Sequence, residues 1–193
     1  MLRYLDVQNI LDKNDLILQE SGCVGSENER GNTYMKKIGI VTDSHSSISQ
    51  EEAEKLGIFV LPMPFYIDGV CYYESVTLSR ELFFEKLAAG ADITTSQPSP
   101  TAVMEIWDKA LEQFEKILYM PISSGLSGSY ETAMMLAKDE AYEGRVLVVD
   151  DGQVAAPLHQ MVLDTLDMIE KGYEAEQIRD LLERAGDRMR IYI

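Results

Sequence analysis

The sequence feature that most constrains the fold is an alternation of short apolar stretches with helix-like stretches, which begins near residue 36. The stretches 37–43, 116–122 and 145–151 are apolar, as the buried strands of a parallel sheet are. Strands that alternate with helices favour a mainly parallel sheet with right-handed crossovers and helices on both faces. The sequence therefore predicts an α/β fold.

Helix start signals divide the chain between these strands. A serine precedes each of three predicted helices, and these serines are Ser49, Ser79 and Ser99. Ser99 is followed by a proline, which favours the first helical position, so the stretch 93–99 is predicted to be a loop. The stretch 58–67 is predicted to be a single apolar strand, and an Asp-Gly turn after it predicts a hairpin partner at 70–75.

Residues 1–34 differ in composition from the rest of the chain. A short amphipathic stretch there is followed by a polar segment rich in glycine, serine and asparagine, which is typical of a linker. We therefore expect residues 1–34 to be an extension or linker, with a composition compatible with disorder, and residues 35–193 to form the α/β domain. The final stretch, 188–193, is predicted to begin a further strand.

Composition and charge disfavour several classes of partner. The 193-residue chain has 17 Lys and Arg against 33 Asp and Glu, a net charge of -16, which opposes binding to nucleic acid or to an anionic membrane. No apolar run is long enough to span a bilayer. Cys23 and Cys71 lie far apart without a C-x-x-C motif, so neither a disulfide framework nor a zinc site is indicated. We expect a soluble, cytoplasmic protein without stable membrane insertion.

Two loops rich in hydroxyl side chains are the clearest functional signal. The first, in "ITTSQPSPTA", contains Thr94, Thr95, Ser96 and Ser99. The second, in "ISSGLSGSYETA", contains Ser123, Ser124, Gly125, Ser127, Gly128 and Ser129. Each loop leads into a predicted helix, whose free amide groups and dipole favour an anion. The G-x-x-x-x-G-K-[ST] and G-x-G-x-x-G motifs of nucleotide sites are absent, and neutral donors suit a single carboxylate.

Three other interpretations of these loops are open. Serines and threonines before helices are often only caps and turns, and Ser99 is expected to be a cap first. "GLSGS" is close to the nucleophile elbow G-x-S-x-G, which would make Ser127 the nucleophile and His159 the base of a serine esterase-like acyl hydrolase. Position 129 is serine, however, where that motif has its second glycine. The third interpretation is a truncated remnant that folds but binds nothing.

Polar residues at the ends of the predicted strands could border the same site. Asp43 and Ser44 follow the first strand, although Asp43 could equally cap the next turn. Asp150 and Asp151 end another strand, but their spacing does not indicate a metal site, and no metal is expected. His45 is interpreted as a loop residue.

The segments "KIGIVTDSHSS", "TTSQPSP" and "ISSGLSGSYETA", in this order and spacing, resemble the DegV family of fatty-acid-binding proteins from about Met35 onwards. The resemblance implies that the domain binds one long-chain fatty acid and no other cofactor. It implies that the carboxylate is bound by Thr95 and Ser124. The full set of ligand-binding residues that it indicates is Thr95, Ser96, Ser123, Ser124, Gly125 and Ser127.

The same resemblance implies a carrier and not an enzyme. Such proteins present the fatty acid to a fatty acid kinase, which makes the acyl phosphate for phospholipid synthesis in bacteria. Family members continue into a second α/β domain, and this chain resembles the first domain with the second largely absent. Apolar residues that could surround the acyl chain are Phe59, Leu61, Met63, Phe65, Met134 and Met135.

Overall fold

The computed structural model describes residues 36–73 and 77–186. The predictions for the linker at 1–34 and for the strand at 188–193 lie outside these ranges. None of the helices in the described ranges combines the length and the apolar character that crossing a bilayer requires.

Four parallel strands form the central sheet, in the order β2-β1-β6-β7. Their bounds are β1 (Lys36–Asp43), β2 (Phe59–Leu61), β6 (Phe114–Met120) and β7 (Val146–Val148). In the register, Thr42 of β1 is opposite both Val60 of β2 and Met120 of β6, so the carboxyl ends of these strands lie at one edge. The prediction of a mainly parallel sheet is confirmed.

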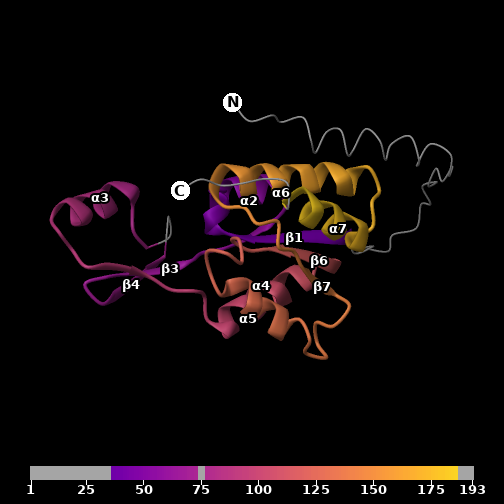
Figure 1. Cartoon of the computed structure of the whole chain (residues 1–193), viewed down its shortest axis with the longest axis horizontal. Coiled ribbons are helices and arrows are strands. Elements are labelled where there is room, and N and C mark those ends of the chain that lie inside the picture. The colour runs from indigo at the N-terminus through magenta and orange to yellow at the C-terminus, as the bar shows by residue number, and fades with distance from the viewer. Residues whose placement is uncertain (1–35, 74–76, 187–193) are drawn as a thin grey trace. The chain divides into compact units, whose positions relative to one another are not determined.

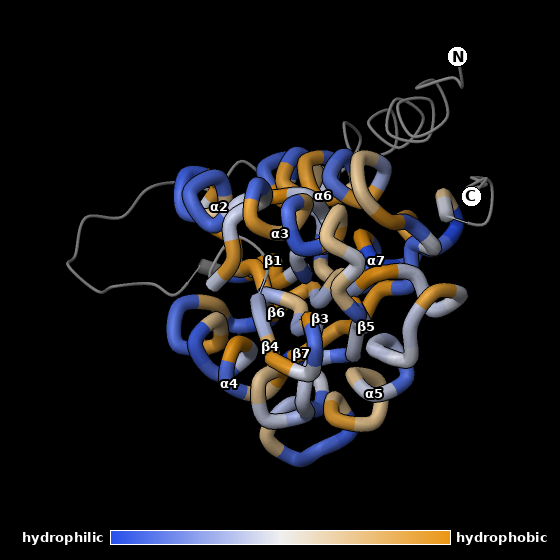
Figure 2. Tube along the Cα trace, turned by 90° about the vertical axis from the view of Figure 1, so that its left-hand side faces the viewer, coloured by the Kyte–Doolittle hydropathy of each residue, from blue (hydrophilic) through white to orange (hydrophobic). Residues whose placement is uncertain are grey.

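Helices cover both faces of this sheet (Figure 1). One face carries α2 (Gln50–Leu56), α6 (Ala155–Glu170) and α7 (Ala175–Gly186), and the other carries α4 (Pro100–Leu111) and α5 (Ser129–Leu136). Figure 2 shows the hydrophobic strands in the middle, with polar residues on the outer sides of the helices. Under α4, the fully buried Trp107 meets Tyr119 and Tyr142 edge to face, so the core is centred on that side.

The three predicted serine caps are all present. Ser49, Ser79 and Ser99 precede α2, α3 (Arg80–Ala88) and α4 respectively. Each hydroxyl accepts a hydrogen bond from the amide three residues later, at 3.1, 3.3 and 3.2 Å. Because these bonds satisfy amides that the helix itself leaves unpaired, the local sequence is enough to fix where the three helices begin.

A second, antiparallel sheet corrects two of the predictions. It has the order β4-β3-β5, with β3 (Pro64–Ile67), β4 (Val70–Tyr73) and β5 (Ile93–Thr95). The stretch 58–67 is therefore two strands and not one, because Pro62 and Pro64 cannot donate to a continuous ladder. The stretch 93–99 is not all loop, since residues 93–95 pair with β3.

The predicted hairpin between β3 and β4 is confirmed. The two strands pair antiparallel, and Asp68 and Gly69 between them have φ angles of 50° and 78°. Two positive φ angles are what a tight two-residue turn requires, which explains the Asp-Gly sequence. We use the name α3 lobe for β3, β4, α3 and β5, residues 64–73 and 77–95. The lobe is the part of the fold that strand and helix alternation alone does not predict.

Gly39 of β1 is a position at which the core tolerates little added volume. A Cβ at residue 39 would lie 2.5 Å from Cδ2 of Phe114, whose ring packs edge-on against Phe59. We expect Gly39→Ala to lower the free energy of unfolding by about 1–3 kcal/mol through overpacking, as measured by urea denaturation. Phe114→Leu should cost less in the Gly39→Ala background than in the wild type. Equal costs in the two backgrounds would show that the ring is not the obstacle.

Candidate ligand-binding site

A cavity of about 660 Å³ lies where the α3 lobe meets the carboxyl ends of β1 and β2. Its apolar wall includes Val60, Met63, Phe65, Leu78, Phe83, Phe84 and Ile93. Its polar groups are mainly hydroxyls, from Ser44, Ser47, Ser49, Ser79, Thr95 and Ser96, together with Gln50 and His45. Volume and lining are those of a small-molecule site, which is mostly apolar with a few polar groups that orient the ligand.

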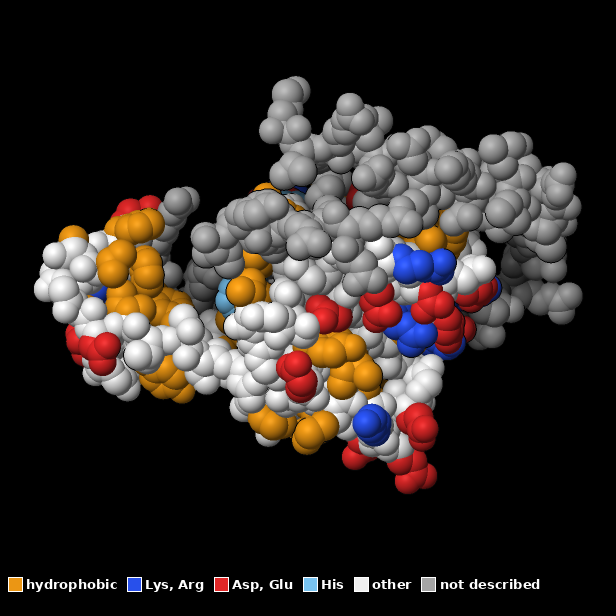
Figure 3. All heavy atoms as spheres, in the orientation of Figure 1, with side chains coloured by type: hydrophobic (Ala, Val, Ile, Leu, Met, Phe, Trp, Pro, Cys, Tyr) orange, Lys and Arg blue, Asp and Glu red, His pale blue; other side chains and the backbone are white. Residues whose placement is uncertain are grey.

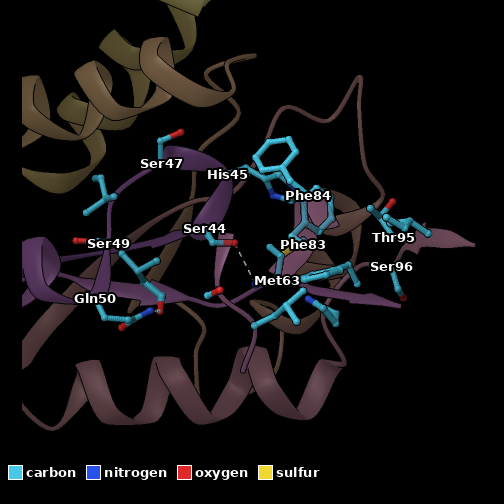
Figure 4. Close-up of a pocket in the computed structure, with 17 residues that line it drawn as sticks. Ser44, His45, Ser47, Ser49, Gln50, Met63, Phe83, Phe84, Thr95 and Ser96 are labelled. Carbon is cyan, nitrogen blue, oxygen red and sulfur yellow. Dashed lines mark hydrogen bonds between the residues drawn. The ribbon is translucent and has the colours of Figure 1, made fainter. Parts of the chain in front are cut away.

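The arrangement of the lining residues is drawn in Figure 4. Thr95 and Ser96 lie at one end of the labelled set, Ser47, Ser49 and Gln50 at the other, and His45, Phe83 and Phe84 between them. Phe84 is 52% exposed although it lines the wall, and Figure 3 shows hydrophobic side chains gathered over the α3 lobe. The apolar wall of the cavity is therefore partly exposed to solvent at Phe84.

The first hydroxyl loop reaches this cavity. Thr95 ends β5 opposite Phe65, and within the described residues its hydroxyl makes no hydrogen bond. Ser96 is engaged locally, because its amide donates to the Pro64 carbonyl at 3.3 Å and its hydroxyl donates to the Gln97 carbonyl at 3.1 Å. Of the two, Thr95 is the residue with a hydroxyl available to a ligand.

The second hydroxyl loop does not line the cavity, and most of its serines stabilise the loop itself. The Ser123 hydroxyl, which is buried, accepts from the Gly125 amide at 3.3 Å. The Ser127 hydroxyl lies 2.8 Å from that of Ser129. Ser124 differs, because only its amide is engaged, donating to Asp150 at 3.3 Å. Within the described part of the chain the Ser124 hydroxyl has no partner, so it too is available.

Gln97 connects the two loops. Its Oε1 accepts from the Thr132 hydroxyl of α5 at 3.4 Å. A Cβ at Gly128 would lie 3.1 Å from the same oxygen, so glycine gives this side chain room. The loops before α4 and α5 are therefore neighbours, and the amide ends of both helices lie at this edge of the fold. This adjacency is the part of the predicted anion site that the structure brings together.

The buried carboxylate of Asp43 bonds both to the start of the second hydroxyl loop and to the turn that follows β1. The carboxylate is fully buried and accepts hydrogen bonds from the Ile122 amide at 2.8 Å and the His45 amide at 2.9 Å. It therefore caps η1 (Ser44–Ser46), and it does not itself line the cavity. Ser44 does line it, and its hydroxyl accepts from the Met63 amide at 3.2 Å. Of the two roles open for Asp43, capping is the observed one.

Ser127 and His159, the two residues that the esterase interpretation requires, have separate hydrogen-bond or ion-pair partners. His159 Nε2 lies 3.3 Å from a carboxylate oxygen of Glu52, on α2, whereas the Ser127 hydroxyl pairs with Ser129. A nucleophile must be within hydrogen-bond reach of its base, and the contacts of these two side chains lie elsewhere. Among the described residues, no group of three or more acidic, histidine or cysteine side chains is placed to hold a metal ion.

The apolar candidates for the acyl chain divide into two groups. Met63 and Phe65 line the cavity, whereas Phe59 and Leu61 pack in or against the core under α4. The remaining two candidates, Met134 and Met135, lie on α5 away from the lining, with Met135 71% exposed. No sequence pattern indicates Phe83, Phe84 and Ile93 as wall residues, because their place on the wall depends on how the α3 lobe folds back over β1.

Fold and cavity together define an α/β protein with a largely uncharged small-molecule pocket. Comparison with known proteins adds the family: residues 37–193 match the family model described as "Uncharacterised protein, DegV family". The chain belongs to the DegV family. It is 34% identical over 144 residues to a DegV domain-containing protein of Caldanaerobacter subterraneus, an alignment that covers 75% of this chain and 51% of that protein.

Solved structures that are similar to this chain include two fatty-acid-binding proteins. A fatty-acid-binding DegV family protein from Thermus thermophilus has a TM-score of 0.70 and 33% identity, covering 78% of this chain and 54% of that one. A stearic acid-binding protein from Eubacterium ventriosum has a TM-score of 0.66 and 25% identity, covering 77% and 52%. The chain thus spans about half the length of the curated relatives and structures that it matches.

Proposed function

We propose that this protein binds a long-chain fatty acid, with the carboxylate at Thr95 and Ser124 and the acyl chain in the cavity. The observation that carries the proposal is the combination of an apolar cavity of about 660 Å³ with an available hydroxyl at its edge and no Lys, Arg, Asp or Glu among the described residues that line it. Two fatty-acid-binding proteins of similar structure, one of them a DegV family protein, support it.

The remaining predicted residues position this site. Ser96, Ser123 and Ser127 use their hydroxyls within their own loops, as described above. They hold the backbone so that Thr95 and Ser124 face the ligand, and Gly125 leaves space for a head group, because a Cβ there would approach no atom closer than 3.6 Å. Four of the six predicted residues, namely Ser96, Ser123, Gly125 and Ser127, therefore act mainly by shaping the two loops.

Tail and head group contribute differently to affinity. Each methylene transferred from water contributes ~0.8 kcal/mol, so about fourteen contribute roughly 11 kcal/mol before the entropic cost of binding. Burying a carboxylate costs several kcal/mol, and hydrogen bonds to a charged group return about 1.5–3 kcal/mol each. The acyl chain therefore supplies affinity, and the hydroxyl groups select a carboxylic acid over other apolar molecules.

We further propose that the protein is a carrier that presents its ligand to a fatty acid kinase. Thr95 is exposed and Ser124 is partly exposed, so a carboxylate bound there stays within reach of an enzyme that phosphorylates it. The separate partners of Ser127 and His159 give no support to the esterase alternative. The kinase partner follows from the family resemblance, and a pull-down with acyl phosphate formation as readout would test it.

The binding function is tested by purifying the chain from a bacterial host and extracting it with organic solvent. Mass spectrometry of the extract should find long-chain fatty acid at close to one molecule per chain. An extract without fatty acid, together with no binding of added palmitate, would instead support the remnant interpretation. Hydrolysis of a p-nitrophenyl ester that is lost in Ser127→Ala would support the esterase.

A further inference from the structure

The turn at residues 150–153, which follows β7, holds the backbone of the second hydroxyl loop. The Ser124 amide donates to Asp150 Oδ1 at 3.3 Å, although the two residues are 26 positions apart in the sequence. The Ser123 amide donates to the Gln153 carbonyl at 3.0 Å. Since two consecutive amides are held by the same turn, the turn sets both the position and the orientation of the backbone that carries the Ser124 side chain.

This turn is stabilised by its own hydrogen bonds. Asp150 Oδ1 also accepts from the Gly152 amide at 3.2 Å, and Asp151 Oδ1 accepts from the Gln153 amide at 2.9 Å. Gln153 Nε2 donates to the Asp151 carbonyl at 3.0 Å, and both of these residues are 1% exposed. Because its shape depends on bonds within the turn and not on a ligand, the turn gives the Ser124 amide a fixed attachment at Asp150.

The loop uses its other amides internally. The Gly125 amide donates to the Ser123 hydroxyl at 3.3 Å, and the next two amides donate to the Ser123 carbonyl at 2.9 and 3.3 Å. Together with the two bonds to the turn, this engages the amides of all residues from 123 to 127. A carboxylate at this part of the loop therefore meets hydroxyls and not free amides, and the available hydroxyl is that of Ser124.

We infer that Asp150 is the positioning residue of the head-group site, because it holds the backbone of Ser124 and thereby places the Ser124 hydroxyl where the carboxylate binds. The inference rests on the proposed fatty-acid function and adds a residue that determines its specificity. An ionised carboxylate only accepts hydrogen bonds, so Asp150 acts through Ser124 and not by contact with the ligand. This role requires the acceptor oxygen of Asp150 and not its charge, and substitutions separate the two.

The test compares the affinity of the 193-residue chain for palmitate in the wild type, Asp150→Ala and Asp150→Asn. Alanine removes the acceptor, and we expect palmitate binding to weaken about tenfold, the effect of losing one well-placed hydrogen bond to a charged group. Asparagine keeps an acceptor oxygen at the same place, so Asp150→Asn should bind palmitate at least as tightly as the wild type.

1-Hexadecanol serves as the uncharged probe and reports whether each variant keeps an intact cavity. Its affinity should change far less than that of palmitate in Asp150→Ala. Asp139→Ala is the matched control, because Asp139 also accepts from a backbone amide, that of Ala141 at 2.9 Å, in the turn beyond α5. Its palmitate affinity should stay within about twofold of wild type, well below the effect of one such hydrogen bond.

The background of Ser124→Ala shows whether Asp150 acts through Ser124. There Asp150→Ala should cost less than about twofold, because the hydroxyl that it positions is already absent. An equal tenfold cost in both backgrounds, a loss in Asp150→Asn as large as in Asp150→Ala, or a parallel loss of 1-hexadecanol binding would overturn the role of Asp150 while leaving fatty-acid binding intact. Failure of the wild type to bind palmitate would overturn the proposed function, and the role of Asp150 with it.

Discussion

Thr95→Ala combined with Ser124→Ala is expected to weaken palmitate binding by about a hundredfold or more. These two residues of the predicted site have hydroxyls without a partner in the described structure. Each donates one hydrogen bond to a charged oxygen in the proposed complex, and such bonds contribute about 1.5–3 kcal/mol. Losing both therefore costs at least about 3 kcal/mol, whereas the affinity for 1-hexadecanol should change far less.

Thr94→Ala is the matched control for this double variant. Thr94 is also an exposed threonine of β5, but adjacent residues of a strand point to opposite faces, and Thr94 does not line the cavity. Its removal should leave palmitate binding within about twofold of wild type, a small change on the scale of one hydrogen bond. If Thr94→Ala weakened binding as much as the double variant, the effect would be one of lobe stability and not of head-group recognition.

Asp151→Asn is expected to stabilise the protein at neutral and alkaline pH. Asp151 is 1% exposed; its Oδ1 accepts from the Gln153 amide at 2.9 Å, and Oδ2 has no partner among the described groups. Burial raises the pKa of this carboxyl to about 7, and the negative charges of Asp150 and Asp43 add to the effect. The folded protein therefore holds a proton that the unfolded chain releases near pH 4.

The sign of the pH dependence follows from this difference. Between about pH 4 and pH 7 the folded state binds more protons than the unfolded state, so stability falls by about 1.4 kcal/mol per pH unit and then levels off. Asp151→Asn imitates the protonated form and should remove this slope, with a gain on the order of a few kcal/mol at pH 8. Asp180→Asn, at an exposed position on α7, should keep the wild-type slope. An unchanged slope in Asp151→Asn would mean that the carboxyl is hydrated in solution.

The large elements of the fold could be predicted because their signals are local. Serine caps at 49, 79 and 99 mark helix starts through bonds that span three residues, and the Asp-Gly turn fixes the β3–β4 hairpin. The three-stranded sheet of the α3 lobe could not be predicted in the same way. Ile93–Thr95 is a strand because it pairs with β3, which lies almost thirty residues earlier in the chain. The sequence of a short segment does not indicate such a distant partner.

The candidate site likewise has a part that could be predicted from local sequence and a part that could not. The family resemblance singled out Thr95 and Ser124, and the two hydroxyl-rich loops that contain them could be recognised from residue type and spacing. The role of Ser44 and His45 as wall residues could not, because it depends on the α3 lobe lying over the end of β1. His45 lies in η1, directly after β1, and its Nδ1 is 3.2 Å from Asp43 Oδ1.

The central claim is that hydroxyl groups hold the acid while its chain occupies the cavity, and a structure of the 193-residue chain with palmitate tests it most directly. We expect carboxylate oxygens within ~3 Å of the hydroxyls of Thr95 and Ser124, with the alkyl chain running along Met63 and Phe83. Palmitate bound with its carboxylate away from both hydroxyls, or with its chain outside the cavity, would contradict it.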